Sequence, residues 1–203
     1  YFNGSPAYTT NTPTISLNFS MTNAHSMIEV PPTGLDPNSD AGKAYIYNNA
    51  QIVLVVTNTG VSVKIQAAPS SGSTPASDPS PIILTNTLAK ATNFPFLTVT
   101  NTMTDQRELS KIVKLTQIDI GKYANWIKTN ASVLSKFSGT YPTILYVDAN
   151  QVVTSSQMNG VRLINGTNLP YNGGAGFSVC TPDALYVKGH YNCTNSSYLG
   201  TTN

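Results

Sequence analysis

The amino-acid sequence predicts a mainly β fold with one packed α-helix, arranged as a short-stranded β-helix-like or sandwich-like stack. Two observations lead to this prediction. Runs of three to five β-forming residues recur along the chain, and turns rich in glycine, asparagine or proline separate them. One stretch, residues 120–137, places its apolar residues at helical spacing instead.

The 203 residues suffice for one β-rich domain or two small ones. Three segments differ in character: a polar, turn-rich N-terminal segment (1–43), a hairpin followed by a strand–helix–strand unit (44–148), and a stack of short strands (149–203). In the first segment, short strands are expected at 14–19 and 27–30.

The strongest strand signal is the hairpin at residues 52–65. Residues 52–56 are continuously apolar and β-branched or leucine, Asn58-Thr59-Gly60 supplies a turn, and Val61, Val63 and Ile65 alternate with polar residues. One strand should therefore be buried on both faces and the other on one face. Residues 68–81 are rich in serine and proline and predict an exposed loop.

The predicted helix begins after Asp119, a good N-cap residue, and runs to residue 137 before Gly139. Trp126 lies beside its apolar stripe and is expected in the core or at its edge. Strands are expected before and after this helix and further upstream, at 112–118, 143–147 and 96–99.

Short apolar runs continue to the C-terminal end of the stack, at 161–164, 177–179 and 185–187. Turns are expected at Asn159-Gly160 and Asn165-Gly166, because both residue types adopt positive φ readily. These runs suit a parallel β-helix, a meander or a small sandwich. We expect the last strand to leave one edge open. Another subunit, or the rest of the same polypeptide, is expected to cover this edge.

The composition excludes some classes of function. Only 10% of the residues are charged, against about 25% in typical globular proteins, and the net charge is +2. Neither value indicates binding to nucleic acid or to an anionic membrane. No apolar stretch is long enough for a membrane span. Low charge, many hydroxyl groups and a candidate disulfide together favour an exported protein, extracellular or at the cell surface.

The two cysteines, Cys180 and Cys193, predict a disulfide across residues 181–192. Two alternatives stay open: a pair of buried thiols, or a nucleophile and base formed by Cys180 and His190. No residue that would orient His190 is evident. Six Asn-X-Ser/Thr triplets are candidate glycosylation sites, at Asn3, Asn18, Asn130, Asn165, Asn192 and Asn195.

Other polar groups favour structural roles. Asp36, Asn38 and Asp40 alternate as in a calcium-binding loop, but the following spacing does not fit, so no metal and no cofactor are predicted. Asp105, Arg107 and Glu108 are expected to form a local ion-pair network. His25 is expected to be solvated or to have a capping role.

Three blocks carry a resemblance to a known family: residues 44–63, residues 104–127, and residues 160–192 with the sequence TPDALYVKGHYN at 181–192. They resemble successive blocks of uncharacterised exported bacterial proteins related to pilus assembly, which have an N-terminal pilin-like anchor and a T-P-x-x-L-Y-V-x-G-x-Y-N block. This resemblance implies a place in a pilus or surface assembly. It transfers no catalytic residue.

The sequence therefore predicts a non-enzymatic structural or adhesive subunit of an extracellular, pilus-associated or cell-surface assembly. Its expected partners are other protein subunits, through self-association, or the rest of a longer polypeptide. The alternative is a carbohydrate-binding or carbohydrate-cleaving β-helix domain. That function needs acidic and aromatic residues gathered on one face, whereas the nine acidic residues are scattered along the sequence.

Overall fold

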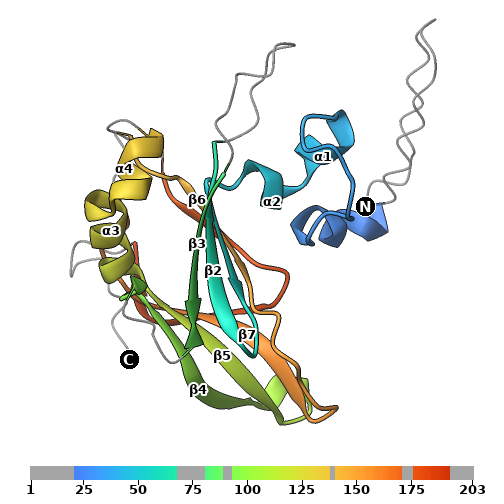
Figure 1. Ribbon diagram of the computed structural model, residues 1–203. Coiled ribbons are helices and arrows are strands. Elements are labelled where there is room, and N and C mark those ends of the chain that lie inside the picture. Colours follow the sequence, from blue (N-terminus) through green and yellow to red (C-terminus); the bar gives the residue numbers. More distant parts are fainter. Residues whose placement is uncertain (1–20, 68–80, 89–92, 138–139, 171–175, 193–203) are drawn as a thin grey trace, which may run out of the picture.

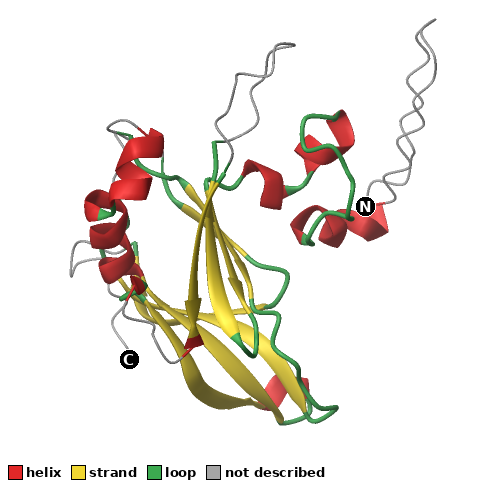
Figure 2. Ribbon diagram, in the orientation of Figure 1, coloured by secondary structure: helices red, strands yellow, loops and turns green. Residues whose placement is uncertain are grey.

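A computed structural model describes residues 21–67, 81–88, 93–137, 140–170 and 176–192. Its strands form two mixed sheets that face each other, with few helices (Figures 1 and 2). The predicted mainly β fold with a packed helix is confirmed.

The first sheet has the strand order β3-β2-β1-β6-β8. Its strands are β1 (Ile52–Val56), β2 (Gly60–Ile65), β3 (Ile82–Thr87), β6 (Ile144–Asp148) and β8 (Ser178–Cys180). The predicted hairpin is confirmed, since β1 and β2 pair antiparallel with Val56 opposite Val61. Four of the five residues of β1 are buried, and burial alternates along β2, as the two apolar patterns predict.

The second sheet has the order β4-β5-β7-β9. Its strands are β4 (Leu97–Asp105), β5 (Lys111–Asp119), β7 (Gln157–Gly166) and β9 (Ala184–Tyr191). β4 and β5 form an antiparallel pair, whereas β5, β7 and β9 are parallel. From β5 onward the chain alternates between the sheets, and each of β6 to β9 pairs parallel with an earlier strand of the same sheet. This part of the fold is a stack of parallel strands, in line with the predicted β-helix-like or sandwich-like stack.

The helix α3 (Ile120–Thr129) begins where the sequence predicts. Asp119 has extended backbone, and its Oδ1 accepts a hydrogen bond from the backbone N–H of Lys122 at 2.9 Å. Its Oδ2 accepts from Nδ2 of Asn165, at the end of β7, at 2.7 Å. One carboxylate therefore starts the helix and fixes it to the second sheet.

The prediction of one uninterrupted helix to residue 137 is wrong. Asn130 has φ −74° and ψ 122°, which ends α3, and a second helix, α4 (Ala131–Phe137), follows at once. The side-chain oxygen of Asn130 accepts from the backbone N–H groups of Ser132 and Val133. An asparagine side chain can accept hydrogen bonds from the backbone N–H groups that follow it. This stabilises the end of one helix and the start of another at Asn130, in place of continuous helical hydrogen bonding.

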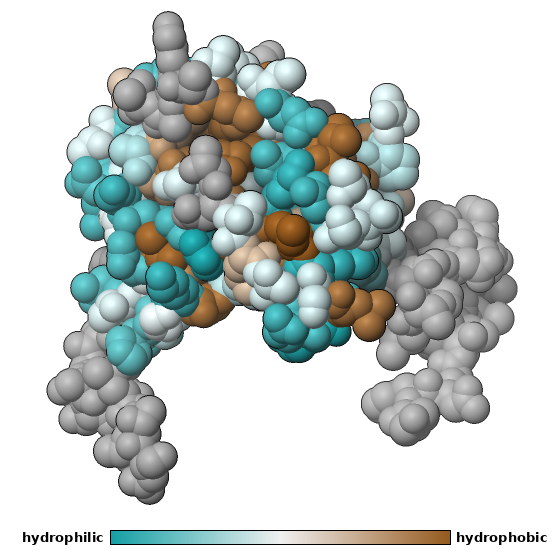
Figure 3. Space-filling view, turned by 90° about the horizontal axis from the view of Figure 1, so that it is seen from below, coloured by the Kyte–Doolittle hydropathy of each residue, from teal (hydrophilic) through white to brown (hydrophobic). Residues whose placement is uncertain are grey.

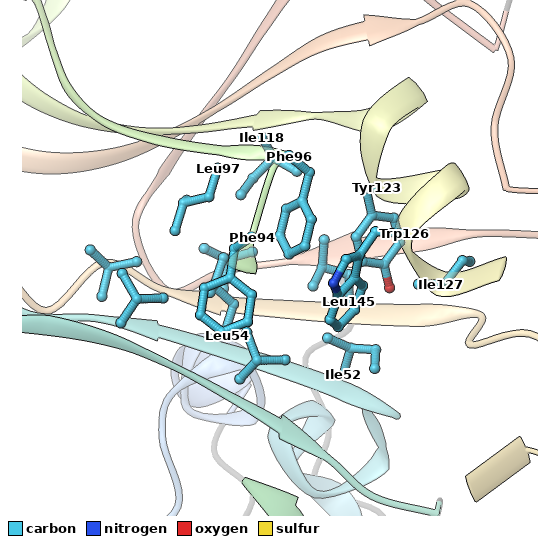
Figure 4. Close-up of a cluster of buried hydrophobic side chains, with 14 of the residues drawn as sticks. Ile52, Leu54, Phe94, Phe96, Leu97, Ile118, Tyr123, Trp126, Ile127 and Leu145 are labelled. Carbon is cyan, nitrogen blue, oxygen red and sulfur yellow. The ribbon is translucent and has the colours of Figure 1, made fainter. Parts of the chain in front are cut away.

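The core lies between the sheets and under α3 (Figure 4). Trp126 is 5% exposed, and its ring packs against Phe94, Phe96 and Tyr123, with centroids 5.0 to 6.3 Å apart. The prediction that Trp126 belongs to the core is confirmed. Helix α3 thus supplies the aromatic side chains that fill one end of the space between the sheets.

The N-terminal part of the described chain covers the outer face of the first sheet, at the right in Figure 1. It contains the 3-10 helix η1 (Met21–Ile28) and the short helices α1 (Asp40–Ala44) and α2 (Ile46–Asn49). The predicted strand at 27–30 is therefore wrong. The ring of Tyr47 meets that of Tyr146 edge-on at 5.2 Å, and the Tyr146 hydroxyl donates to the carbonyl of Ile28.

Other sequence predictions have mixed outcomes. Asn159 and Gly160 lie within β7, so the predicted turn is wrong. The glycine is needed instead because the Tyr186 ring lies too close for a side chain at position 160. Asn165 does adopt a positive φ of 52° at an irregularity of the sheet. The strand expected at 14–19 and nearly all of the loop at 68–81 lie outside the described residues. Segments 44–148 and 149–203 both contribute strands to the two sheets and residues to the same core.

Candidate functional site

The candidate site is the edge at which both sheets end, formed by β8 and β9. Each is the terminal strand of its sheet among the described residues, since β8 pairs with β6 and β9 with β7. Residues 181–183 join β8 directly to β9, so the two edges lie at the same end of the molecule. Edge strands present backbone donors and acceptors that another strand can pair with.

Apolar side chains of the core face continue onto β9. Parallel neighbours in register point to the same face of a sheet, and Leu185 lies beside Val161 while Val187 lies beside Leu163. Val161 and Leu163 are 0% and 2% exposed, whereas Leu185 and Val187 are 45% and 52% exposed. The row of core side chains therefore continues onto β9, where the described residues leave it about half exposed.

Tyr186 connects β9 to β4 on the outer face of the second sheet, opposite to the core face. Its hydroxyl donates to Asp105 Oδ2, at the end of β4, over 2.7 Å. The ring passes over Gly160, where an added Cβ would lie 2.9 Å from Tyr186 Cε2 and 2.6 Å from Val113 Cγ1. One side chain thus spans the sheet from β9 to β4, with a glycine beneath it.

Arg107 completes this contact. Its Nε and Nη2 donate to the two oxygens of Asp105 at 3.2 and 2.9 Å, which is the predicted ion pair, while Glu108 is exposed. The hydrogen bond from Arg107, and to a smaller extent the one from Tyr186, holds the pKa of Asp105 well below its usual range. Burial, together with the hydrogen bond to Asp105, raises the pKa of Tyr186 to about 12. Both groups keep their charge state near neutral pH.

The structure does not bring Cys180 and His190 together in one sheet. Cys180 ends β8, whereas His190 is exposed near the far end of β9. Burial raises the pKa of the Cys180 thiol, which disfavours the reactive thiolate. Cys193 lies outside the described residues, so the disulfide stays a prediction. An intervening eight-residue strand covers about 26 Å, so this bond would require the chain near residue 193 to fold back along β9.

Three candidate glycosylation sites are described: Asn130, Asn165 and Asn192. The first caps α4, and the other two have a φ of 52°. Asn165 also donates to Asp119, so the side chains of Asn130 and Asn165 have local structural roles. Asn3, Asn18 and Asn195 lie outside the described residues, and glycosylation of all six stays a prediction.

The residues of the candidate calcium loop form a turn, Asp36 to Asn38, and the start of α1 at Asp40. Asp36 Oδ1 accepts from the backbone N–H of Asn38 at 2.9 Å, and Ser39 caps α1 just before Asp40. Among the described residues, no group of three or more His, Cys, Asp or Glu side chains is placed to hold a metal ion. His25 is exposed, and its Nδ1 lies 2.7 Å from Oε1 of Glu29.

A cluster of carboxyl groups near β8 was not predicted from the sequence. Asp183 Oδ2 accepts from the backbone N–H of Ala149, the residue after Asp148, at 2.9 Å. Burial, followed by the charges of Asp183 and Glu29, raises the pKa of Asp148 to about 6. Burial also raises the pKa of Asp183. Asp148 ends β6 and Asp183 follows β8, so only knowledge that these strands are parallel neighbours would have placed them together.

Comparison with protein-family models, with curated proteins and with solved structures found no match. The helices in the described part of the chain are all too short or too polar to cross a membrane. Viewed from below, apolar residues reach the surface at several places with polar residues between them (Figure 3). The geometry of the β8–β9 edge is therefore the main basis for a functional proposal.

Proposed function

We propose that this protein is a non-enzymatic structural or adhesive subunit of an extracellular, pilus-associated or cell-surface assembly. Its sheets associate with other protein subunits through the β8–β9 edge. The low charge content and the resemblance of three sequence blocks to pilus-assembly-related proteins support this proposal. The observation that carries it is the exposure of Leu185 and Val187, which belong to the core face but lie on an edge strand.

An edge that stays in solvent usually carries devices against strand addition, such as lysines, bulges or inward-pointing charges. The second half of β9 has such devices: Lys188, a register shift opposite Ile164–Gly166, and Gly189 with a φ of 86°. The first half, Ala184–Val187, has none of them and carries the exposed aliphatic side chains. Strand addition is therefore expected along this first half.

Two lysines on the core face of β9 should prevent this association. Leu185→Lys/Val187→Lys places two charges where a partner strand would cover them. Both positions are about half exposed in the monomer, so the lysine charges can stay in solvent and the monomer should still fold. In sedimentation velocity and electron microscopy over a concentration series, we expect wild-type protein to assemble and the double variant to stay monomeric. Leu109→Lys, at a turn residue that is 94% exposed, is the control and should assemble. A double variant that assembles like wild type would contradict the proposal, and so would a wild-type protein that stays monomeric.

The pair of Asp148 and Asp183 favours a second candidate, a carbohydrate-binding or carbohydrate-cleaving β-helix domain. A carboxyl group with a pKa of about 6 suits a general acid, and glycosidases use two carboxyl groups at a defined separation. A polysaccharide panel assayed between pH 5 and 7 tests it. Hydrolysis that Asp148→Asn abolishes would support this candidate, and a wild-type protein that neither binds nor cleaves any member would remove it.

A further inference from the structure

We infer that the partner at the β9 edge is β9 of a second copy of this chain, paired antiparallel about a two-fold axis at Tyr186. This inference rests on the proposed function and names the partner strand and its register. Residues 184–188 would form the pairing segment, because Gly189, with a φ of 86°, ends the regular part of the strand. Tyr186 is the centre of these five residues.

The register makes the exposed side chains complementary to themselves. With Tyr186 opposite Tyr186, Leu185 of each copy lies directly opposite Val187 of the other, and both point to the core face. The two copies therefore bring four half-exposed aliphatic side chains into one cluster, which continues the row formed by Val161 and Leu163. A contact that uses the same patch on both copies is the usual form of a two-fold interface.

The single free edge selects this arrangement over parallel pairing. Strand β7 occupies the other edge of β9, so two copies can pair only through the same edge. Parallel pairing through that edge would turn the core face of one copy onto the outer face of the other, and the aliphatic side chains of the two copies would then point to opposite faces. In the antiparallel register Lys188 lies opposite Ala184, an uncharged residue, at the end of the paired segment.

The rest of the edge is compatible with this pairing. The Tyr186 ring extends away from the edge, over Gly160 toward Asp105, so it does not obstruct an approaching strand on the outer face. Three residues join β8 to β9, so β8 lies near the same contact. Among the described strands, β3 and β4 end the sheets on the other side.

Disulfide trapping tests the register. Leu185→Cys and Val187→Cys are each made in a Cys180→Ser/Cys193→Ser background, and a melting curve confirms that each variant folds. Directly opposite residues have Cα atoms about 4.5–5.5 Å apart, within disulfide range, whereas two copies of position 185 would lie about 8 Å apart. After mild oxidation of an equimolar mixture, mass spectrometry should find the mixed 185–187 disulfide in several-fold excess over either symmetric one. Leu109→Cys mixed with Leu185→Cys should give no specific product.

The outcomes separate the inference from the proposed function. A predominant 185–185 disulfide would indicate a register centred on residue 185 and would overturn the register centred on Tyr186. A second outcome is that the Leu185→Lys/Val187→Lys substitutions abolish assembly while the 185–187 disulfide forms in no excess over the symmetric ones. That result would also overturn the two-fold arrangement, but the β9 edge would remain the assembly site. If wild-type protein neither assembles nor forms cross-links between copies, both proposals are wrong.

Discussion

At the residue scale, Gly160 shows how the sheet accommodates Tyr186. The sequence around it predicts a turn, since asparagine precedes glycine. The structure instead uses the missing side chain to let the Tyr186 ring cross β7 and reach Asp105 on β4. A glycine within a strand often marks such a close approach.

Gly160→Ala should therefore destabilise the fold. The added Cβ would lie 2.6 Å from Val113 Cγ1 and 2.9 Å from the Tyr186 ring, so the ring or the strand must move. We expect a loss of about 1–3 kcal/mol in unfolding free energy, as for other overpacked sites. Gly121→Ala is the matched control, because its nearest contacts would be at 3.5 Å or more. Equal denaturation midpoints for both variants would contradict the role assigned to Gly160.

Asp148 predicts a dependence of stability on pH. Its pKa in the folded protein is about 6, above the ordinary value of 3.8, because of burial and the charges of Asp183 and Glu29. The protonated form is thus favoured by folding, and this stabilisation is present below pH 3.8 and is lost as pH rises through 6. The raised pKa of Asp183 acts in the same direction. Asp105, whose pKa is lowered, loses its contribution only as pH falls below 3.8.

Melting temperatures measured from pH 4 to pH 7.5 check this dependence. For the wild type we expect a decrease from pH 4 to about pH 6 and little further change above it. Asp148→Asn should flatten the decrease and raise the melting temperature at pH 7.5, because an amide carries no charge near Asp183, Glu29 and the Tyr146 hydroxyl. Asp40→Asn is the control at an exposed position. A wild-type melting temperature that rises between pH 4 and 6 would exclude a raised pKa at Asp148 as the dominant effect.

At the element scale, α3 joins the two sheets through its cap and its aromatic side chains. Trp126→Ala should cost about 3–5 kcal/mol, as large aromatic truncations in cores do, because the indole packs against Phe94, Phe96 and Tyr123. Leu134→Ala on α4, at a residue that is 40% exposed, should cost much less. Chemical denaturation of both variants measures the difference. A wild-type midpoint for Trp126→Ala would show that the ring contributes little to the core.

Elements with strong local signals could be predicted from the sequence. The β1–β2 hairpin and the start of α3 follow from alternation and from the Asp119 cap. The break at Asn130 was missed because the apolar spacing continues across it, and only the hydrogen bonds of the asparagine side chain show that it begins a new helix. The acidic cluster was missed because Asp148 and Asp183 are distant in sequence and meet only through the pairing of β6 with β8.

At the scale of the whole molecule, the fold combines antiparallel strands with a stack of parallel strands. The chain places the strands of this stack in the two sheets alternately, and β8 and β9 are the last of them that the structure describes. Within the described residues, nothing covers the outer side of Leu185 and Val187 fully, as their exposures of 45% and 52% show. This open end is the feature that connects the fold to the proposed assembly.

Hydrogen exchange at the β9 amides tests the central claim most directly. We expect the amides of residues 185–187 to exchange faster in dilute monomer than in concentrated, assembled protein, with the largest gain in protection there. Amides of β1, at the centre of the first sheet, should be strongly protected in both samples. Equal and strong protection of residues 185–187 in a proven monomer would show that the chain covers its own edge, and would contradict assembly through β9.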